Sequence, residues 1–258
     1  MVDSTVLPSI AERVDGVDTE LFAAIPSQTS VRDRRALLAI QAAVANQHVP
    51  FSYLEIGSYL GGSLQVVVAD SRCTEVISID SRPPWAPDDR AGMEGFDYPD
   101  NSAGRMLELL RGVPGADLTK LRTIEASTES IPPRECGSPH VCFIDGEHTR
   151  AAALRDARFC RSVMGGTGII VFHDFWIISG AVLDLIRETS GPWRAYLLAG
   201  IRGGGVFVVE LGVPTLLDDP RVRRELWPRR GWGIANRMNL VPWLLRADLV
   251  RQRLRGLR

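Results

Sequence analysis

The hydrophobic residues of this chain gather in short runs that alternate with longer stretches of helical periodicity. Five of these runs are four to six residues long and end at polar residues or glycine, as buried parallel strands do. The five predicted strands span 53–56, 75–80, 121–126, 141–145 and 168–172. Two further runs, 194–198 and 206–210, are joined by a glycine-rich stretch without a helix, which predicts an antiparallel hairpin.

Between most of these strands the spacing of apolar residues favours helices. The predicted helices span about 31–46, 64–69, 102–111, 149–163 and 177–188. Ser27-Gln28-Thr29-Ser30 and Thr149 offer capping side chains at two helix starts. This order predicts an α/β fold: a doubly wound, Rossmann-like, mostly parallel sheet with helices on both faces and a C-terminal antiparallel hairpin. Ligands of such sheets bind outside the carboxyl ends of the strands.

Residues 81–100 interrupt the pattern with a stretch rich in Pro, Trp, Asp, Gly and Tyr. A loop of this length inside a compact domain is typical of a lid or binding loop, and a disordered insertion is the alternative. We expect its aromatic residues, Trp85, Phe96 and Tyr98, to form part of a substrate pocket.

Polar residues follow the predicted strands at the edge where a doubly wound sheet binds its ligand. Asp80 stands 23 positions after Gly57, where such folds place the acid that accepts hydrogen bonds from a ribose diol. The phosphate-binding pattern GxGxxG is absent, and the carboxylate of Glu55 would repel a pyrophosphate. The pattern therefore indicates an adenosine-bearing cofactor with a cationic group.

A combination of motifs at these strand ends resembles a known family over about residues 27–210. The motifs are Glu55-x-Gly57-x-x-x-Gly61-x-Ser63, then Asp80, then Ile144-Asp145-Gly146-Glu147-His148, then Val171-Phe172-His173-Asp174. They resemble the class I S-adenosylmethionine-dependent methyltransferases, and most of all the branch of bacterial natural-product and sugar O-methyltransferases, methyltransferase family 24. The resemblance implies the class I methyltransferase fold and S-adenosylmethionine as cofactor.

The resemblance also implies which residues bind the cofactor. Glu55, Gly57 and Gly61 would surround its methionine part, Asp80 would hold the ribose hydroxyls, and the Ser127 region would contact the adenine. The rest of the predicted cofactor-binding set is Ser58, Ser63 and Asp145. We expect the chain to have three parts. Residues 1–50 form an N-terminal helical cap, 51–210 the catalytic domain, and 211–258 a basic helical appendage. The cap is expected to fold over the cofactor near Ser27–Ser30.

Two catalytic roles are open for the polar residues after the last parallel strands. His148, with Asp145 beside it, can act as a general base that removes the proton of an acceptor hydroxyl. Alternatively, or in addition, Asp145, His173 and Asp174 can hold a divalent cation such as Mg²⁺ that lowers the pKa of that hydroxyl. Several members of the branch that this chain resembles carry two adjacent carboxylates where it has His173-Asp174. A histidine nitrogen suits magnesium less well than a carboxylate oxygen does. A third interpretation is that His173 and Asp174 only cap the following helix.

Composition adds limits on partners and compartment. Residues 213–258 carry eleven arginines against four acids, a charge of +7, which leaves about −8 on the rest of a chain whose net charge is −1. We interpret this basic tail as a solvated helix face or an arm on an acidic partner subunit, with association of copies through the terminal helices left open. The four cysteines lack CxxC spacing and are expected to be buried free thiols. Without a visible signal sequence or spanning segment, we expect a cytoplasmic protein that does not bind nucleic acid.

The sequence thus predicts a methyltransferase that methylates an oxygen of a small hydroxylated acceptor, such as a sugar or a secondary metabolite. Two alternatives remain at this point. One is a metal-dependent hydrolase or nucleotide-using oxidoreductase on the same sheet. The other is a non-catalytic binding protein that acts through the basic tail.

Overall fold

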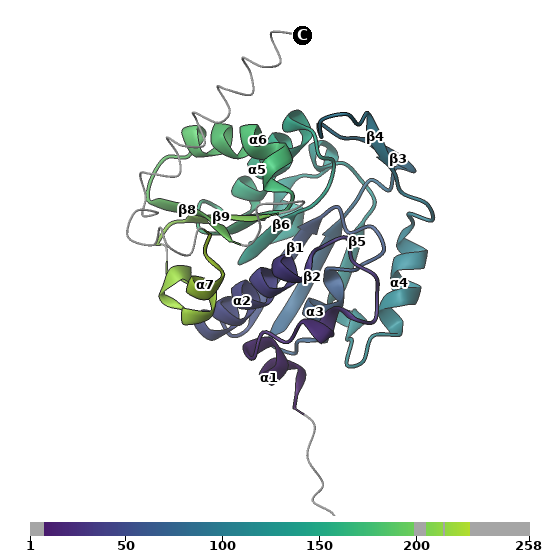
Figure 1. Ribbon diagram of the computed structural model, residues 1–258, viewed down its shortest axis with the longest axis vertical. Helices are drawn as coiled ribbons and strands as arrows, with labels where there is room; N and C mark the ends of the chain where they lie inside the picture. The colour runs from purple at the N-terminus through teal and green to yellow at the C-terminus, as the bar shows by residue number, and fades with distance from the viewer. Residues whose placement is uncertain (1–7, 199–204, 214, 228–258) are drawn as a thin grey trace, which may run out of the picture.

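A computed structural model of the chain describes residues 8–198, 205–213 and 215–227. Its centre is a seven-stranded sheet in the order β5-β2-β1-β6-β7-β9-β8 (Figure 1). The strands of this sheet are β1 (Phe51–Ile56), β2 (Cys73–Ile79), β5 (Leu121–Ile124), β6 (Val141–Ile144), β7 (Gly168–Phe172), β8 (Trp193–Leu198) and β9 (Val206–Leu211). The first five are mutually parallel, and β9 runs antiparallel to both β7 and β8, which confirms the predicted fold class.

The described α-helices cover both faces of this sheet. They are α1 (Ile10–Asp15), α2 (Val31–Gln47), α3 (Leu64–Ala69), α4 (Ala103–Arg111), α5 (Arg150–Val163), α6 (Phe175–Glu188) and α7 (Pro220–Glu225). Short 3₁₀ helices lie at Thr19–Phe22, Leu118–Lys120, Thr128–Ser130, Pro133–Cys136 and Leu216–Asp218. The predicted caps are confirmed, because the side chains of Ser30 and Thr149 accept backbone hydrogen bonds at the starts of α2 and α5. Ser102 caps α4 in the same way.

Two hydrophobic cores form, one on each face of the sheet. Helices α2, α3, α4 and α7 pack on the first face, and α5 and α6 pack on the second. Successive residues of a strand point to opposite faces, so Tyr53 enters the first core and its neighbours Leu54 and Ile56 enter the second. Helix α7 buries Val222 in the same core as α2, so the described start of the predicted appendage, 215–227, packs on the main domain.

The stretch 81–100 is more ordered than the sequence predicted. Within it β3 (Trp85–Pro87) and β4 (Gly95–Asp97) form an antiparallel pair of their own. The indole of Trp85 lies against Gly95, where a Cβ would meet it at 2.2 Å, so glycine is required for the two strands to approach. This β3–β4 hairpin lies at the same edge of the molecule as the carboxyl ends of the parallel strands (Figure 1).

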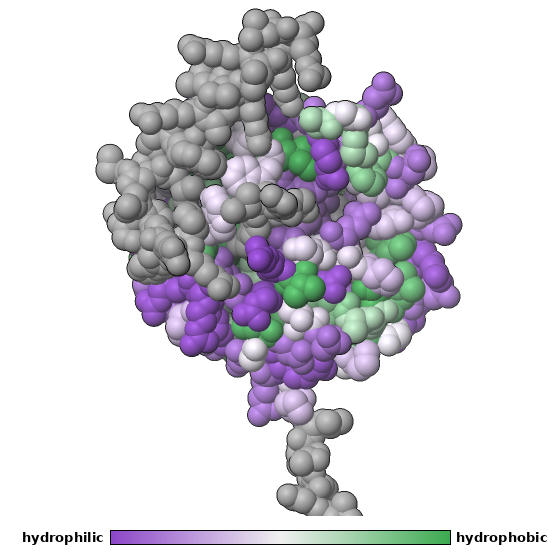
Figure 2. Space-filling view, viewed as in Figure 1, coloured by the Kyte–Doolittle hydropathy of each residue, from purple (hydrophilic) through white to green (hydrophobic). Residues whose placement is uncertain are grey.

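All four cysteines are buried and free, as expected. Among the described residues, none of the helices is both long and apolar enough for a membrane span. On the face shown in Figure 2, hydrophilic residues dominate the coloured surface and hydrophobic ones show in smaller areas between them. Trp227, in the described part of the predicted appendage, packs edge-to-face on Trp176.

Candidate active site

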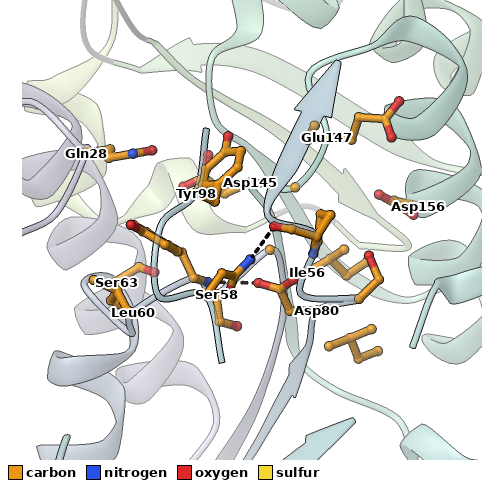
Figure 3. A pocket seen from close by; sticks show the side chains of 18 of the residues that line it. Gln28, Ile56, Ser58, Leu60, Ser63, Asp80, Tyr98, Asp145, Glu147 and Asp156 are labelled. Carbon is orange, nitrogen blue, oxygen red and sulfur yellow. Dashed lines mark hydrogen bonds between the residues drawn. The ribbon is translucent and has the colours of Figure 1, made fainter. Parts of the chain in front are cut away.

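A cavity opens at the carboxyl ends of the parallel strands. It lies beside β1, between β2 and β6, where the order of the strands in the sheet reverses. Its volume is about 940 Å³ including the open mouth, which is enough for a nucleoside cofactor. Figure 3 shows Gln28 and Ser63 on one side of it and Glu147 and Asp156 on the other. The described lining contributes four carboxylates and one arginine, namely Asp80, Asp145, Glu147, Asp156 and Arg155. The cavity is therefore acidic and suits a cationic ligand.

The turn after β1 requires glycine. Gly57 has a φ of +86°, in the left-handed region that side chains disfavour. A Cβ at this position would lie 2.4 Å from the carbonyl oxygen of Asp145 and 2.4 Å from the Cα of Gly146. The ends of β1 and β6 are thus packed backbone against backbone, and all three residues line the cavity.

Asp80 lies at the end of β2 in the cavity wall, where the sequence predicted a ribose-binding acid. Its carboxylate, labelled in Figure 3, accepts hydrogen bonds from the backbone N–H groups of Tyr59, at 2.9 Å, and Arg82, at 2.7 Å. The Arg82 guanidinium adds an ion pair at 3.4 Å. These bonds hold the carboxylate in place and leave lone pairs for further donors such as ribose hydroxyls.

Ser127 also lines the cavity, beside two residues that sequence reasoning missed. The hydroxyl of Thr128 donates to the Asp156 carboxylate at 2.6 Å, and burial raises the pKa of that carboxyl. Such a pair offers hydrogen bonds to the polar edge of an adenine ring. Asp156 belongs to the inward face of α5, where sequence periodicity predicts packing on the sheet rather than contact with a ligand.

Ser58 and Ser63 line the cavity, but two other predicted cofactor residues, Glu55 and Gly61, do not. Glu55 is fully buried and accepts hydrogen bonds from the hydroxyls of Tyr53, at 2.8 Å, and Ser63, at 2.7 Å. Residues 53 and 55 point to the same face of β1, so this carboxyl lies behind the cavity wall, under α3. Glu55 is linked to the cavity lining through the hydroxyl of Ser63.

Burial raises the pKa of Glu55 to about 7, so the stability of the fold should depend on pH through this residue. The folded state holds a proton that the unfolded state releases above about pH 4.5, so stability falls as pH rises from about 4.5 to about 7. We expect Glu55→Gln to remove this decline, which amounts to about 3 kcal/mol. Urea unfolding at pH 5 and pH 8 measures it.

The exposed residue Glu108 provides the control for that measurement. Glu108→Gln should leave the pH dependence of the unfolding free energy unchanged, since the Glu108 side chain is exposed to solvent. If the unfolding free energies of wild type and Glu55→Gln fell equally between pH 5 and pH 8, Glu55 would not be the group that causes the decline.

The predicted catalytic residues form a buried cluster that adjoins the cavity at Asp145. The Nδ1 atom of His173 lies 2.8 Å from Asp145 Oδ1, and the Nε2 atom of His148 lies 3.7 Å from the same oxygen. Burial alone would raise the pKa of Asp145, but the two imidazoles outweigh it and lower that pKa to about 2. In the same way burial opposes charge on the histidines, yet the surrounding aspartates raise the pKa of His148 and raise that of His173 well above its usual range.

The β3–β4 hairpin brings two further charged residues to this cluster that sequence reasoning missed, Asp88 and Arg90. Asp88 is buried, and its carboxylate lies 3.0 Å from His148 Nδ1. The backbone N–H of Asp89 donates to the carbonyl oxygen of His148, which fixes the hairpin to the turn after β6. The acids in 81–100 were visible in the sequence, but nothing there paired one of them with a histidine 60 positions away.

Of the three aromatic residues predicted to form a pocket, Tyr98 lines the cavity, and burial raises the pKa of its hydroxyl to about 12. Trp85 and Phe96 lie outside the lining of this cavity. The Phe96 ring is instead covered by the guanidinium of Arg90, 5.3 Å from its centroid.

The N-terminal segment closes another side of the cavity. Pro26, Ser27 and Gln28 are among its lining residues, and a Cβ on Gly62 would lie 2.7 Å from the Pro26 carbonyl oxygen. Just beyond, Asp33 at the start of α2 is buried with its carboxylate 3.6 Å from His173 Nε2. The helical cap thus contacts both the cavity and the cluster.

The residues predicted to hold a metal ion do not fit one as they are arranged. Ionised Asp145 can only accept a hydrogen bond, so His173 Nδ1 carries the proton between them and has no lone pair for a metal. Asp174 Oδ2 accepts a hydrogen bond from Arg90 Nη2 at 3.1 Å. Within the described residues, no group of three or more His, Cys, Asp or Glu side chains is arranged to hold a metal ion. Asp174 also makes no side-chain cap on α6, which argues against a purely capping role.

Comparisons with known proteins agree with this geometry. The family model described as a methyltransferase domain matches residues 54–175, which run from β1 to the start of α6. That range holds the glycine turn, Asp80 and the whole sequence from Asp145 to Asp174. A comparison with curated proteins finds no match.

Solved structures with this fold include several methyltransferases. The O-methyltransferase NovP is 16% identical, with a TM-score of 0.51, over 70% of this chain and 82% of its own. The calicheamicin methyltransferase CalS11 is 16% identical, with a TM-score of 0.50, over 79% and 92%. A Klebsiella pneumoniae protein assigned as an O-methyltransferase is 15% identical, with a TM-score of 0.50, over 81% and 93%. At these identities the likeness shows the fold. The family match shows that residues 54–175 form a methyltransferase domain, which indicates an S-adenosylmethionine-dependent methyltransferase.

Proposed function

We propose that this methyltransferase transfers the methyl group of S-adenosylmethionine to a hydroxyl oxygen of a small acceptor, such as a sugar or a secondary metabolite. The observation that supports this most is the acidic cavity at the ends of β1, β2 and β6, which joins the His148–Asp145 cluster at Asp145. NovP and CalS11, which share the fold, are by name an O-methyltransferase and a calicheamicin methyltransferase, which favours this acceptor class.

The cofactor, when bound, supplies an electrophilic methyl group on a sulfonium. We propose that Asp80 accepts hydrogen bonds from its ribose and that Ser127, with Thr128 and Asp156, contacts its adenine. Gly57, Ser58 and Ser63 would border the methionine part, with Glu55 and Gly61 supporting that wall from behind. Because four carboxylates line the cavity, its field favours the cationic sulfonium over an anionic phosphate.

We propose that His148 takes the proton of the acceptor hydroxyl. Its Nδ1 faces the Asp88 carboxylate, so a neutral imidazole carries its proton there and presents a lone pair at Nε2. Nε2 has no hydrogen-bond partner among the described residues and lies 3.4 Å from Asp174 Oδ2. During methyl transfer from the sulfonium to the acceptor oxygen, His148 Nε2 would accept the hydroxyl proton.

The three-part division of the chain also remains a proposal. Residues 1–50 would cover the cofactor, 51–210 carry the reaction, and 211–258 form the appendage. Within the described residues Arg35 of α2 pairs with Glu225 of α7 at 2.7 Å, so the first and last parts are in contact. Association of copies, the cytoplasmic compartment and the role of the arginine-rich tail stay predictions, the tail from 228 onward lying outside the described residues.

His148→Gln should lower the rate of methyl transfer by about 100-fold or more, since general-base catalysis contributes that much, while binding of S-adenosylmethionine is retained. The assay incubates the protein with S-adenosylmethionine and a panel of small hydroxylated compounds and follows a mass increase of one methyl group. Variant and wild type are then compared on any acceptor that wild type methylates.

The matched control is His140→Gln. His140 precedes β6, at the opposite end of that strand, where its ring is hydrogen-bonded to Ser52 and lies beside His48. Its replacement should leave the transfer rate within about twofold. A His148→Gln protein that methylates as fast as wild type would remove His148 from the reaction.

A further inference from the structure

Arg90 places a fixed positive charge inside the aspartate cluster of the candidate active site. Its Nη2 donates a hydrogen bond to Asp174 Oδ2 at 3.1 Å and lies 3.7 Å from Asp88 Oδ2. Its guanidinium also stacks over Phe96 of the same hairpin. Two carboxylates and a ring thus define the position of the group, although the side chain as a whole is 39% exposed.

The other carboxylates of the cluster already face imidazoles. Asp145 accepts from His173 Nδ1, Asp33 lies 3.6 Å from His173 Nε2, and Asp88 faces His148 Nδ1. Asp174 also lies 3.4 Å from His148 Nε2. Arg90, 3.1 Å from Asp174, differs from these imidazoles because its guanidinium stays positively charged at every pH of interest.

We propose that Arg90 takes the place of a divalent metal ion at Asp174, so that this methyltransferase works without one. The guanidinium neutralises the Asp174 carboxylate that a metal ion would need, and it already contacts Oδ2 of that carboxylate. Unlike a metal ion, it cannot act as a Lewis acid on the acceptor oxygen, so proton removal is left to a protein base. The proposal builds on the proposed function, because it concerns the same site.

The test measures binding of Mn²⁺, a spectroscopically visible divalent probe, without any acceptor. Wild type should bind Mn²⁺ more weakly than about 1 mM, as measured by the loss of its free electron-spin-resonance signal. Arg90→Ala should bind it at least about tenfold more tightly, because Asp174 loses its resident cation, and Arg90→Ala/Asp174→Asn should lose that gain. Arg90→Lys keeps the charge and should resemble wild type.

The control is Arg105→Ala, which removes the same charge from a side chain of similar exposure that pairs with Glu108 on α4. It should leave Mn²⁺ binding unchanged. Wild-type Mn²⁺ binding that Asp174→Asn abolishes, or an Arg90→Ala protein with no gain, would overturn the proposal. S-adenosylmethionine binding, measured on the same proteins, tests the proposed function independently. If no protein bound it, the proposed function would be wrong, and the Mn²⁺ result would still decide the role of Arg90.

Discussion

Gly57→Ala is expected to abolish S-adenosylmethionine binding and to destabilise the fold by about 3 kcal/mol. The added methyl group would meet the Asp145 carbonyl oxygen and the Gly146 Cα at 2.4 Å each, and both are backbone atoms that cannot rotate away. The left-handed φ of +86° adds strain at the same residue. Relief requires β1 and β6 to separate at the cavity. Calorimetric titration with the cofactor and urea unfolding measure the two effects.

Gly104→Ala is the matched control for that prediction. A Cβ on Gly104 in α4 meets nothing within 4 Å, so alanine should be neutral or slightly stabilising there. If Gly57→Ala bound the cofactor as wild type does, the close approach of the two strand ends would not be essential to the site.

Asp145→Asn should be the most damaging substitution in the cluster, with loss of methyl transfer and of about 3 kcal/mol or more of stability at neutral pH. His173 is buried, and its pKa is well above the usual range largely because of Asp145. Without that charge the imidazolium is left buried beside Asp33 and Asp174, or must give up its proton. Urea unfolding of variant and wild type at pH 7 measures the loss.

The pH dependence of stability gives an independent check on Asp145. Its pKa of about 2 in the folded state lies below the ordinary 3.8, so its contribution is complete above about pH 4 and is lost as pH falls toward 2. Asp145→Asn should lack this part of acid unfolding. Asp184→Asn, which breaks the outer ion pairs with Arg150 and Arg187, should cost less than about 1 kcal/mol. Equal losses for the two variants would contradict the role given to Asp145.

The order of strands and helices could be predicted from the sequence because the hydrophobic residues of each element repeat with the period of a strand or of a helix. The runs at 75–80 and 141–145 became β2 and β6, each within two residues, and the capping side chains of Ser30 and Thr149 marked the helix starts. Strand ends in a parallel sheet meet at one edge, so Asp80 and Asp145 were brought to one cavity as that topology requires.

The fine structure of the site could not be predicted in the same way. Glu55 occupies a motif position, but the two-residue period of β1 turns its carboxyl toward Tyr53 and Ser63 rather than into the cavity. Asp88 and Arg90 act through contacts between residues 60 and 84 positions apart. Their placement depends on how the β3–β4 hairpin folds back on the sheet, and no local pattern of hydrophobic residues encodes that.

Calorimetric titration of wild-type protein with S-adenosylmethionine, run beside Asp80→Ala, tests the cofactor site most directly. We expect one site per chain, with affinity reduced by about tenfold or more in the variant, because hydrogen bonds from the ligand to a charged group are lost. Absence of binding to wild type, or equal affinity for the two proteins, would contradict the assignment of this cavity as the cofactor site.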